Sequence, residues 1–130
     1  MWPREMMHHR HYTVDEANAK LDLVGRIVRR IRAARRRLDA EGFNPEFVSL
    51  AELSGGAWPG REHAAAALEL ALGFDQLEEL DVVVRDLERG LIDFPSLLGG
   101  EEIYLCWLLD EPEVGHWHAP ESGFGGRRPL

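Results

Sequence analysis

The feature that most constrains the fold is a run of apolar residues spaced alternately by three and four over residues 14–40. Its members are Val14, Ala17, Leu21, Val24, Val28, Ile31 and Leu38. Only Arg35 interrupts the series, and such spacing places the apolar residues on one side of an α-helix. Thr13 and Glu16 have the spacing of a capping box, and Gly42 is a typical helix stop. The pattern therefore predicts one long helix from about residue 14 to residue 40.

A second periodic segment predicts a partner for this helix. Ala66, Leu70, Gly73, Leu77 and Leu80 repeat the four-three spacing, so we expect a helix from near residue 59 to residue 80, antiparallel to the first. Between the two, the Asn-Pro pair at 44–45 predicts a short helix through residue 53. We expect residues 13–80 to be helical and residues 1–12 to form a flexible terminal segment.

After residue 80 the apolar spacing changes from a helical period to a period of two, which is typical of strands. Strands are predicted at 82–84, 91–94, 102–109 and 114–118, with a hairpin turn at 86–90. Residues 102–109 are apolar on both faces, which indicates a central strand. Residues 82–118 therefore predict a small antiparallel sheet of three to four strands, and 119–130, rich in Gly and Pro, an irregular carboxy-terminal arm. The fold class is α+β in a single domain spanning 1–130, with a helical hairpin packed on one face of the sheet.

Composition limits the classes of function. The chain has 130 residues and a net charge of −8, although seven arginines gather on the first predicted helix. An acidic chain is a poor binder of nucleic acid, so we expect these arginines to be solvated or neutralised by acidic side chains of the second half. A single Cys cannot form an internal disulfide, which favours a reducing cytoplasm. No apolar run approaches the roughly 20 residues that span a bilayer, so we expect a soluble protein.

Several segments together carry a family resemblance. They are YTVDEAN at 12–18, RDLERGLIDFP at 85–95, LCW at 105–107, EPEV at 111–114 and WHAPESGFGGR at 117–127. The chain resembles, over nearly its whole length, an uncharacterised bacterial family known as domain of unknown function family 2203. The resemblance implies no activity. His116 stands where the family pattern suggests an aromatic residue.

Two histidines make the sharpest functional hypothesis. His116 and His118 are two residues apart on a predicted strand, so both imidazoles point to one face and can bind one ion. Glu121 is close in the sequence, and Asp93 joins the group if the hairpins pair in a suitable register. A His and carboxylate set suits a divalent transition metal such as zinc, iron or manganese. The alternative is a half-exposed strand whose two histidines bind nothing.

Catalysis has little support in the sequence. Cys106 lies mid-strand between large apolar residues, as a buried inert thiol does, and there is no nucleophile elbow, dinucleotide fingerprint or phosphate loop. The tail at 122–128 could bind an anion, but an arm packed on the sheet or on a partner fits it better. We therefore expect a homo-oligomeric, metal-binding protein more readily than an enzyme, with His118 and Glu121 as the first ligands and His116 and Asp93 next. The alternative function is a protein–protein interaction module that uses the helical hairpin and the arm.

Overall fold

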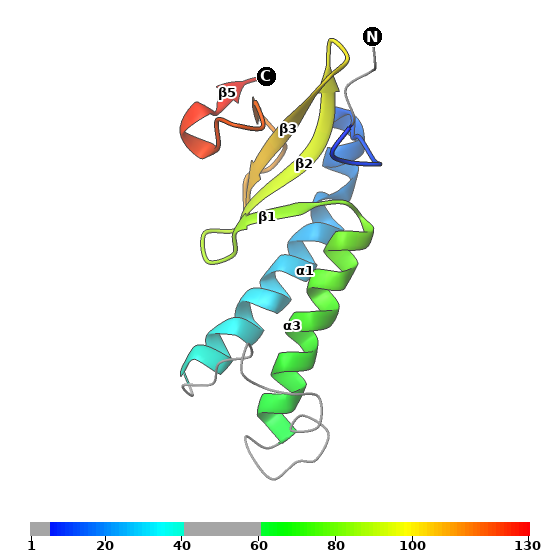
Figure 1. The fold of residues 1–130 in the computed structure, drawn as a ribbon. Helices are drawn as coiled ribbons and strands as arrows, with labels where there is room; N and C mark the ends of the chain where they lie inside the picture. The colour runs from blue at the N-terminus through cyan, green and yellow to red at the C-terminus, as the bar shows by residue number, and fades with distance from the viewer. Residues whose placement is uncertain (1–5, 41–60) are drawn as a thin grey trace.

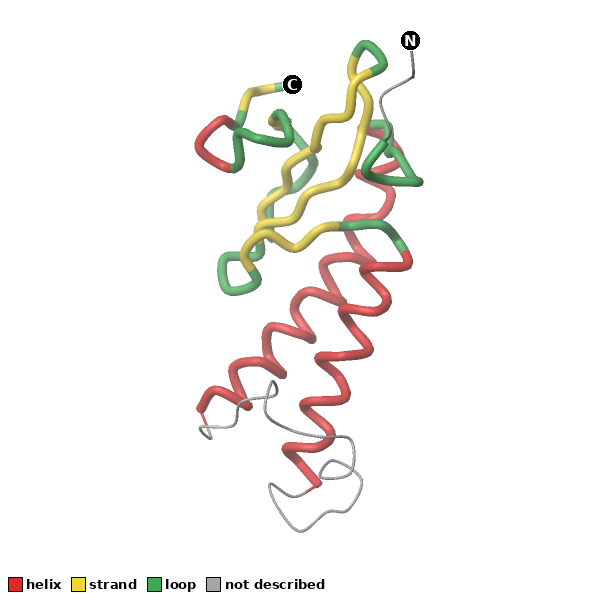
Figure 2. The backbone as a smooth tube through the Cα atoms, viewed as in Figure 1, coloured by secondary structure: helices red, strands yellow, loops and turns green. Residues whose placement is uncertain are grey.

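The computed structural model describes residues 6–40 and 61–130. Within these residues, two long helices precede five strands. Figures 1 and 2 show how these elements are arranged in space. The elements are α1 (Val14–Ala40), α3 (Arg61–Glu79), β1 (Val83–Asp86), β2 (Leu91–Leu98), β3 (Glu101–Leu108), β4 (His116–His118), the short 3-10 helix η2 (Phe124–Gly126) and β5 (Arg128–Pro129). The predicted α+β class is confirmed. The short helix predicted at 44–53 lies outside the described residues.

Helix α1 begins at the predicted capping box. The backbone N–H of Thr13 donates to Glu16 Oε1 at 3.0 Å, and the N–H of Glu16 donates back to Thr13 Oγ1 at 3.1 Å. These bonds satisfy two of the backbone donors that a helix start leaves free. They also hold the pKa of the Glu16 carboxyl below its ordinary value. The helix then buries the apolar side that the sequence predicts, including Ala17, Val24, Val28, Ile31 and Leu38.

The two helices form the predicted hairpin by a close approach at Gly73. A Cβ built on Gly73 would lie 2.0 Å from Ile31 Cγ2, so only a residue without a side chain fits there. The first half of α1 lies beside the sheet, and the rest of the hairpin extends beyond it (Figure 1). Neither described helix has an apolar stretch that could cross a membrane.

Arginines of α1 pair with acidic groups of the same chain. Arg29 contacts Asp110 and Arg36 contacts Glu88 across the fold, while Arg35 pairs with Asp39 one turn along the helix. Most of these side chains are at least half exposed to solvent, so each ion pair contributes little to stability. Their effect is to balance local charge.

The five strands form one antiparallel sheet in the order β1-β2-β3-β4-β5 within the described residues. This is one strand more than the predicted three to four, because part of the expected irregular arm forms β5 against β4. Strand β3 is central, as predicted. Its side chains Leu105 and Trp107, together with Ile92 and Phe94 of β2, belong to the core that the helices share.

Strand β2 continues past Pro95, where we expected it to end. Because β1 pairs only with residues 91–93, the outer edge of β2 is free of β1 from residue 94 onward. The carbonyl of Pro95 points to this edge, where it accepts the N–H of Tyr12 at 2.7 Å. The missing N–H of Pro95 therefore also falls on the edge and removes no bond to β3.

We predict that Gly73→Ala lowers the free energy of unfolding by up to about 2 kcal/mol. Alanine gains about 1 kcal/mol in helix propensity, but its Cβ would overlap Ile31, and overpacking typically costs about 1–3 kcal/mol. Urea unfolding followed by circular dichroism measures the difference.

Gly25→Ala in α1 is the matched control. Its Cβ would meet mainly the mobile end of Arg29, at 3.0 Å from Nη1. We expect this variant to match or exceed the stability of the parent protein. A Gly73→Ala variant as stable as Gly25→Ala would contradict the close packing of the two helices.

Candidate metal centre

The register of β2, β3 and β4 builds a polar group on the sheet face opposite to the core. Asp93 pairs with Cys106, and Cys106 pairs with His116. In the next row, Tyr104 pairs with His118. Directly paired residues of antiparallel strands share a face, so three strands bring their polar side chains together.

Asp93 is the centre of this group, and its carboxylate is fully buried. Its Oδ2 accepts Arg85 Nε at 2.7 Å and lies 2.8 Å from His118 Nε2. Its Oδ1 is buried and has no hydrogen-bond partner. A buried carboxylate needs paired charges, and the free oxygen leaves room for one more positive partner.

The hydrogen bonds of His118 determine what lies between its ring and Asp93. His118 Nδ1 is 2.8 Å from the carbonyl oxygen of Ala119, which can only accept, so Nδ1 carries a hydrogen. The other nitrogen, Nε2, then directs its lone pair at a carboxylate oxygen unless a cation lies between them. At 2.8 Å only a proton fits between these two atoms, and a metal ion would require them to move apart to roughly 3.5 Å. A backbone carbonyl bound to Nδ1 is the common way in which proteins orient a metal-binding imidazole.

Cys106 completes a group of three possible ligands. Ligand atoms of Asp93, Cys106 and His118 all lie within 4.8 Å of one another, and all three residues are buried. Burial, followed by the negative charge of Asp93, raises the pKa of the Cys106 thiol from 9.0 to about 11. The thiol is therefore protonated near neutral pH and a poor nucleophile, as we expected from its position in the strand.

The predicted site residues separate into two places. Asp93 and His118 meet directly, and His116 lies on the same face beside Cys106, with a buried Nδ1 that has no hydrogen-bond partner. Glu121 is exposed and lines a hollow at the end of the sheet, outside the group of three. Sequence reasoning missed Cys106 as a ligand. The available signal was that the period of two places Cys106 and Tyr104 on one face of β3.

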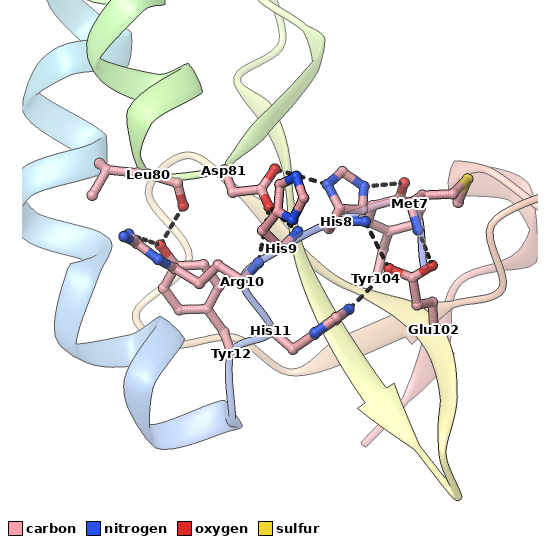
Figure 3. Close-up of polar contacts among 10 residues, drawn as sticks. All are labelled: Met7, His8, His9, Arg10, His11, Tyr12, Leu80, Asp81, Glu102 and Tyr104. Atoms are coloured by element: carbon pink, nitrogen blue, oxygen red, sulfur yellow. Dashed lines mark hydrogen bonds and ion pairs between the residues drawn. The ribbon is translucent and has the colours of Figure 1, made fainter. Parts of the chain in front are cut away.

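A second polar cluster holds the amino-terminal segment. We call residues 7–12 the clasp, because their contacts fasten this segment to β3 and to the end of α3 (Figure 3). Glu102 accepts the N–H groups of Met7 and His8 and contacts His11 Nε2 at 2.9 Å. Asp81 contacts His8 Nδ1 at 2.8 Å and accepts two further backbone N–H groups, from residues 9 and 10. We expected residues 1–12 to be flexible, whereas residues 7–12 are anchored.

The contacts of the clasp change the acidity of its carboxyl groups. Burial alone would raise the pKa of Asp81, but the hydrogen bonds from His8 and from the backbone outweigh it and lower the pKa. The pKa of Glu102 is also lowered, by the Met7 N–H and the His11 ring acting against burial. Both groups therefore hold the clasp most firmly in their charged form.

Tyr104 joins the two clusters. Its hydroxyl lies 2.8 Å from His8 Nε2, and its ring stacks on the ring of His118 with centroids 5.4 Å apart. The guanidinium of Arg85 lies over the same ring, 4.7 Å from its centroid. These contacts fix Tyr104 and limit how far the His118 ring can turn.

The fold and this site define an α+β protein with a buried Asp-Cys-His group on the sheet face away from its core. The chain belongs to the family described as an uncharacterized conserved protein, DUF2203, whose model matches residues 10–130. No curated protein and no solved structure matches it.

We predict that Cys106 makes stability depend on alkaline pH. Because its pKa is raised to about 11 in the folded protein, its contribution is complete below pH 9 and is lost as the pH rises through about 11. Urea unfolding in EDTA, between pH 8 and 11, should show that the stability advantage over Cys106→Ala shrinks. Groups that titrate in both proteins contribute equally to both stabilities, so their effect disappears from the difference. A constant difference over this range would contradict the raised pKa.

Proposed function

We propose that this protein binds a divalent transition metal through Asp93, Cys106 and His118. The supporting observation is the orientation of His118, whose Nε2 faces Asp93 while the backbone of Ala119 retains the hydrogen on Nδ1. The buried, unpaired Oδ1 of Asp93 supplies a second ligand atom without displacing Arg85 from Oδ2. A tetrahedral zinc site has ligand atoms roughly 3.5 Å apart. Closing the group onto an ion therefore needs only small side-chain movements.

The ligand types favour zinc over the other metals that suit the sequence. Thiolate and imidazole ligands suit zinc, with iron as the next choice, whereas manganese prefers oxygen ligands. A thiol that must lose its proton to bind also requires a compartment that keeps it reduced. We therefore also propose a cytoplasmic location.

His116 is the fourth ligand that we propose. It lies outside the group of three but neighbours Cys106 on the same face, and its buried Nδ1 lacks a partner. A rotation of its side chain toward Cys106 would complete a four-ligand site. We do not include Glu121, because it is exposed and lies in the hollow at the end of the sheet.

We predict stoichiometric zinc in protein purified without an affinity tag, measured by elemental analysis. Cys106→Ser and His118→Ala should each lower the zinc affinity at least about tenfold, since loss of a residue that only orients a ligand already costs about 10- to 100-fold. Zinc affinity should also rise with pH by about tenfold per unit for each proton that the ion displaces. Competition with a chromophoric chelator gives both values.

Two variants serve as controls for this experiment. His9→Ala removes an exposed imidazole of the clasp and should leave zinc affinity unchanged, which separates the buried site from adventitious binding near the amino terminus. Glu121→Gln should also have no effect. Folded protein that contains no metal and acquires none on titration would refute the proposal.

We also propose that the protein forms a homo-oligomer through α3. Leu68 and Leu72 lie one turn apart on this helix and are 56% and 54% exposed. Two leucines on one helix turn that remain exposed are suited to burial against a second copy. The carboxy-terminal arm is a weaker candidate for an interface, because Arg127 pairs with Glu111 and β5 pairs with β4 in the same chain.

We predict that the solution mass rises with concentration and that Leu68→Gln/Leu72→Gln weakens the association by more than about tenfold, because burying each leucine contributes roughly 1.5–3 kcal/mol. Analytical ultracentrifugation measures both. Leu97→Gln at the β2–β3 hairpin is the control and should leave association unchanged. A monomer at all concentrations would contradict the prediction.

A further inference from the structure

A hollow of about 610 Å³ opens where residues 119–121 pass the β2–β3 hairpin. Its volume lies within the range of small-molecule sites, roughly 300–1,000 Å³. It is separate from the Asp-Cys-His group, none of whose residues lines it. The chemistry of its lining therefore indicates a ligand of its own.

Four segments supply apolar surface to the hollow. They are the start of the clasp, the tip of β2, the first half of β3 and β4, through Met7, Leu98, Ile103 and Trp117. Met7 and Leu98 are 61% and 53% exposed. A methionine adapts readily to the shape of an apolar partner. The lining thus suits a molecule with an apolar body.

The charged groups of the hollow are all acidic. Glu101, Glu102 and Glu121 line it, and none of its described lining residues is basic. Glu102 already binds the clasp. The side chains of Glu101 and Glu121 are exposed and have no hydrogen bond or ion pair to another described residue. Two carboxylates that have no partner among the described residues, beside apolar surface, favour a positive group and repel a negative one.

One described cation in this region belongs to β5. The guanidinium of Arg128 lies over the Trp117 ring, 5.5 Å from its centroid, but Arg128 does not line the hollow. Among the residues that the structure describes, it therefore leaves the carboxylates of Glu101 and Glu121 without a partner. The same contact shows that a face of this indole accepts a cation.

We propose that this hollow binds a small organic cation: an amine or quaternary ammonium compound with an apolar body. The apolar part lies against Leu98, Ile103 and Trp117. The positive group lies between Glu101 and Glu121. This binding does not depend on a metal in the Asp-Cys-His group.

Three probes with the same tail test the proposal: octylamine, octanol and octanoate, each titrated into the full chain by calorimetry at low salt. We expect octylamine to bind about threefold or more tighter than octanol and at least about tenfold tighter than octanoate, given the modest strength of exposed ion pairs. The preference for octylamine should shrink in 0.5 M NaCl because salt screens exposed charges.

Variants separate the hollow from general attraction to an acidic protein. Glu101→Gln/Glu121→Gln should lower the affinity for octylamine about three- to tenfold and leave the affinity for octanol unchanged. Glu79→Gln/Glu113→Gln removes the same charge elsewhere on the surface and should leave the affinities for octylamine and octanol unchanged. Leu98→Gln should weaken octylamine and octanol alike, since it removes exposed apolar surface without disturbing the core.

The proposal fails if wild-type protein shows no saturable octylamine binding. It also fails if the three probes bind equally, or if the charge-matched control loses as much affinity as the double variant. Circular dichroism of each variant confirms that it is folded. The substituted side chains of both double variants are exposed, so neither should alter the fold.

Discussion

The buried carboxylate of Asp93 is the interaction on which the rest of the sheet depends. A charge fully removed from water is stable only with partners, and Asp93 finds them on both neighbouring sides: Arg85 from β1 and His118 from β4. Because Cys106 of β3 is paired with it, Asp93 brings together side chains from four consecutive strands. Shifting any of these strands by one residue would turn its polar side chain toward the apolar core. The carboxylate therefore fixes strand register as well as the candidate metal site.

Much of the fold follows from patterns that act over short distances. The bounds of α1 and its capping box were predicted correctly because helix spacing and caps are local. The length of β2 was predicted wrongly because Pro95 reads as a strand end. The strand can include Pro95 because β1 does not cover this part of the edge of β2. The sequence does not show how far a neighbouring strand extends. Strand β5 was not predicted for the same reason, because it is defined only by its pairing with β4.

The site was predictable only in part for the same reason. His116 and His118 share a face because residues i and i+2 of a strand always do. Asp93 was predicted to join them only if the strands paired in a suitable register, and the observed register is suitable. The proximity of Cys106 depends on strand pairing across connections of several residues, which local patterns do not fix. The clasp histidines were treated as a loose end because their partners, Asp81 and Glu102, are more than 70 residues away.

The clasp also limits strand pairing along one side of the sheet. Beyond residue 93 the outer edge of β2 is occupied by Tyr12, whose carbonyl accepts the Ser96 hydroxyl at 2.5 Å. At the opposite side, β5 is two residues long and ends in Pro129, which has no N–H to offer a further strand. The stretch of β2 beside Tyr12 and the end of β5 at Pro129 are therefore poor places for another strand to pair. Growth by strand addition at these two places, the route to fibrils, is therefore disfavoured.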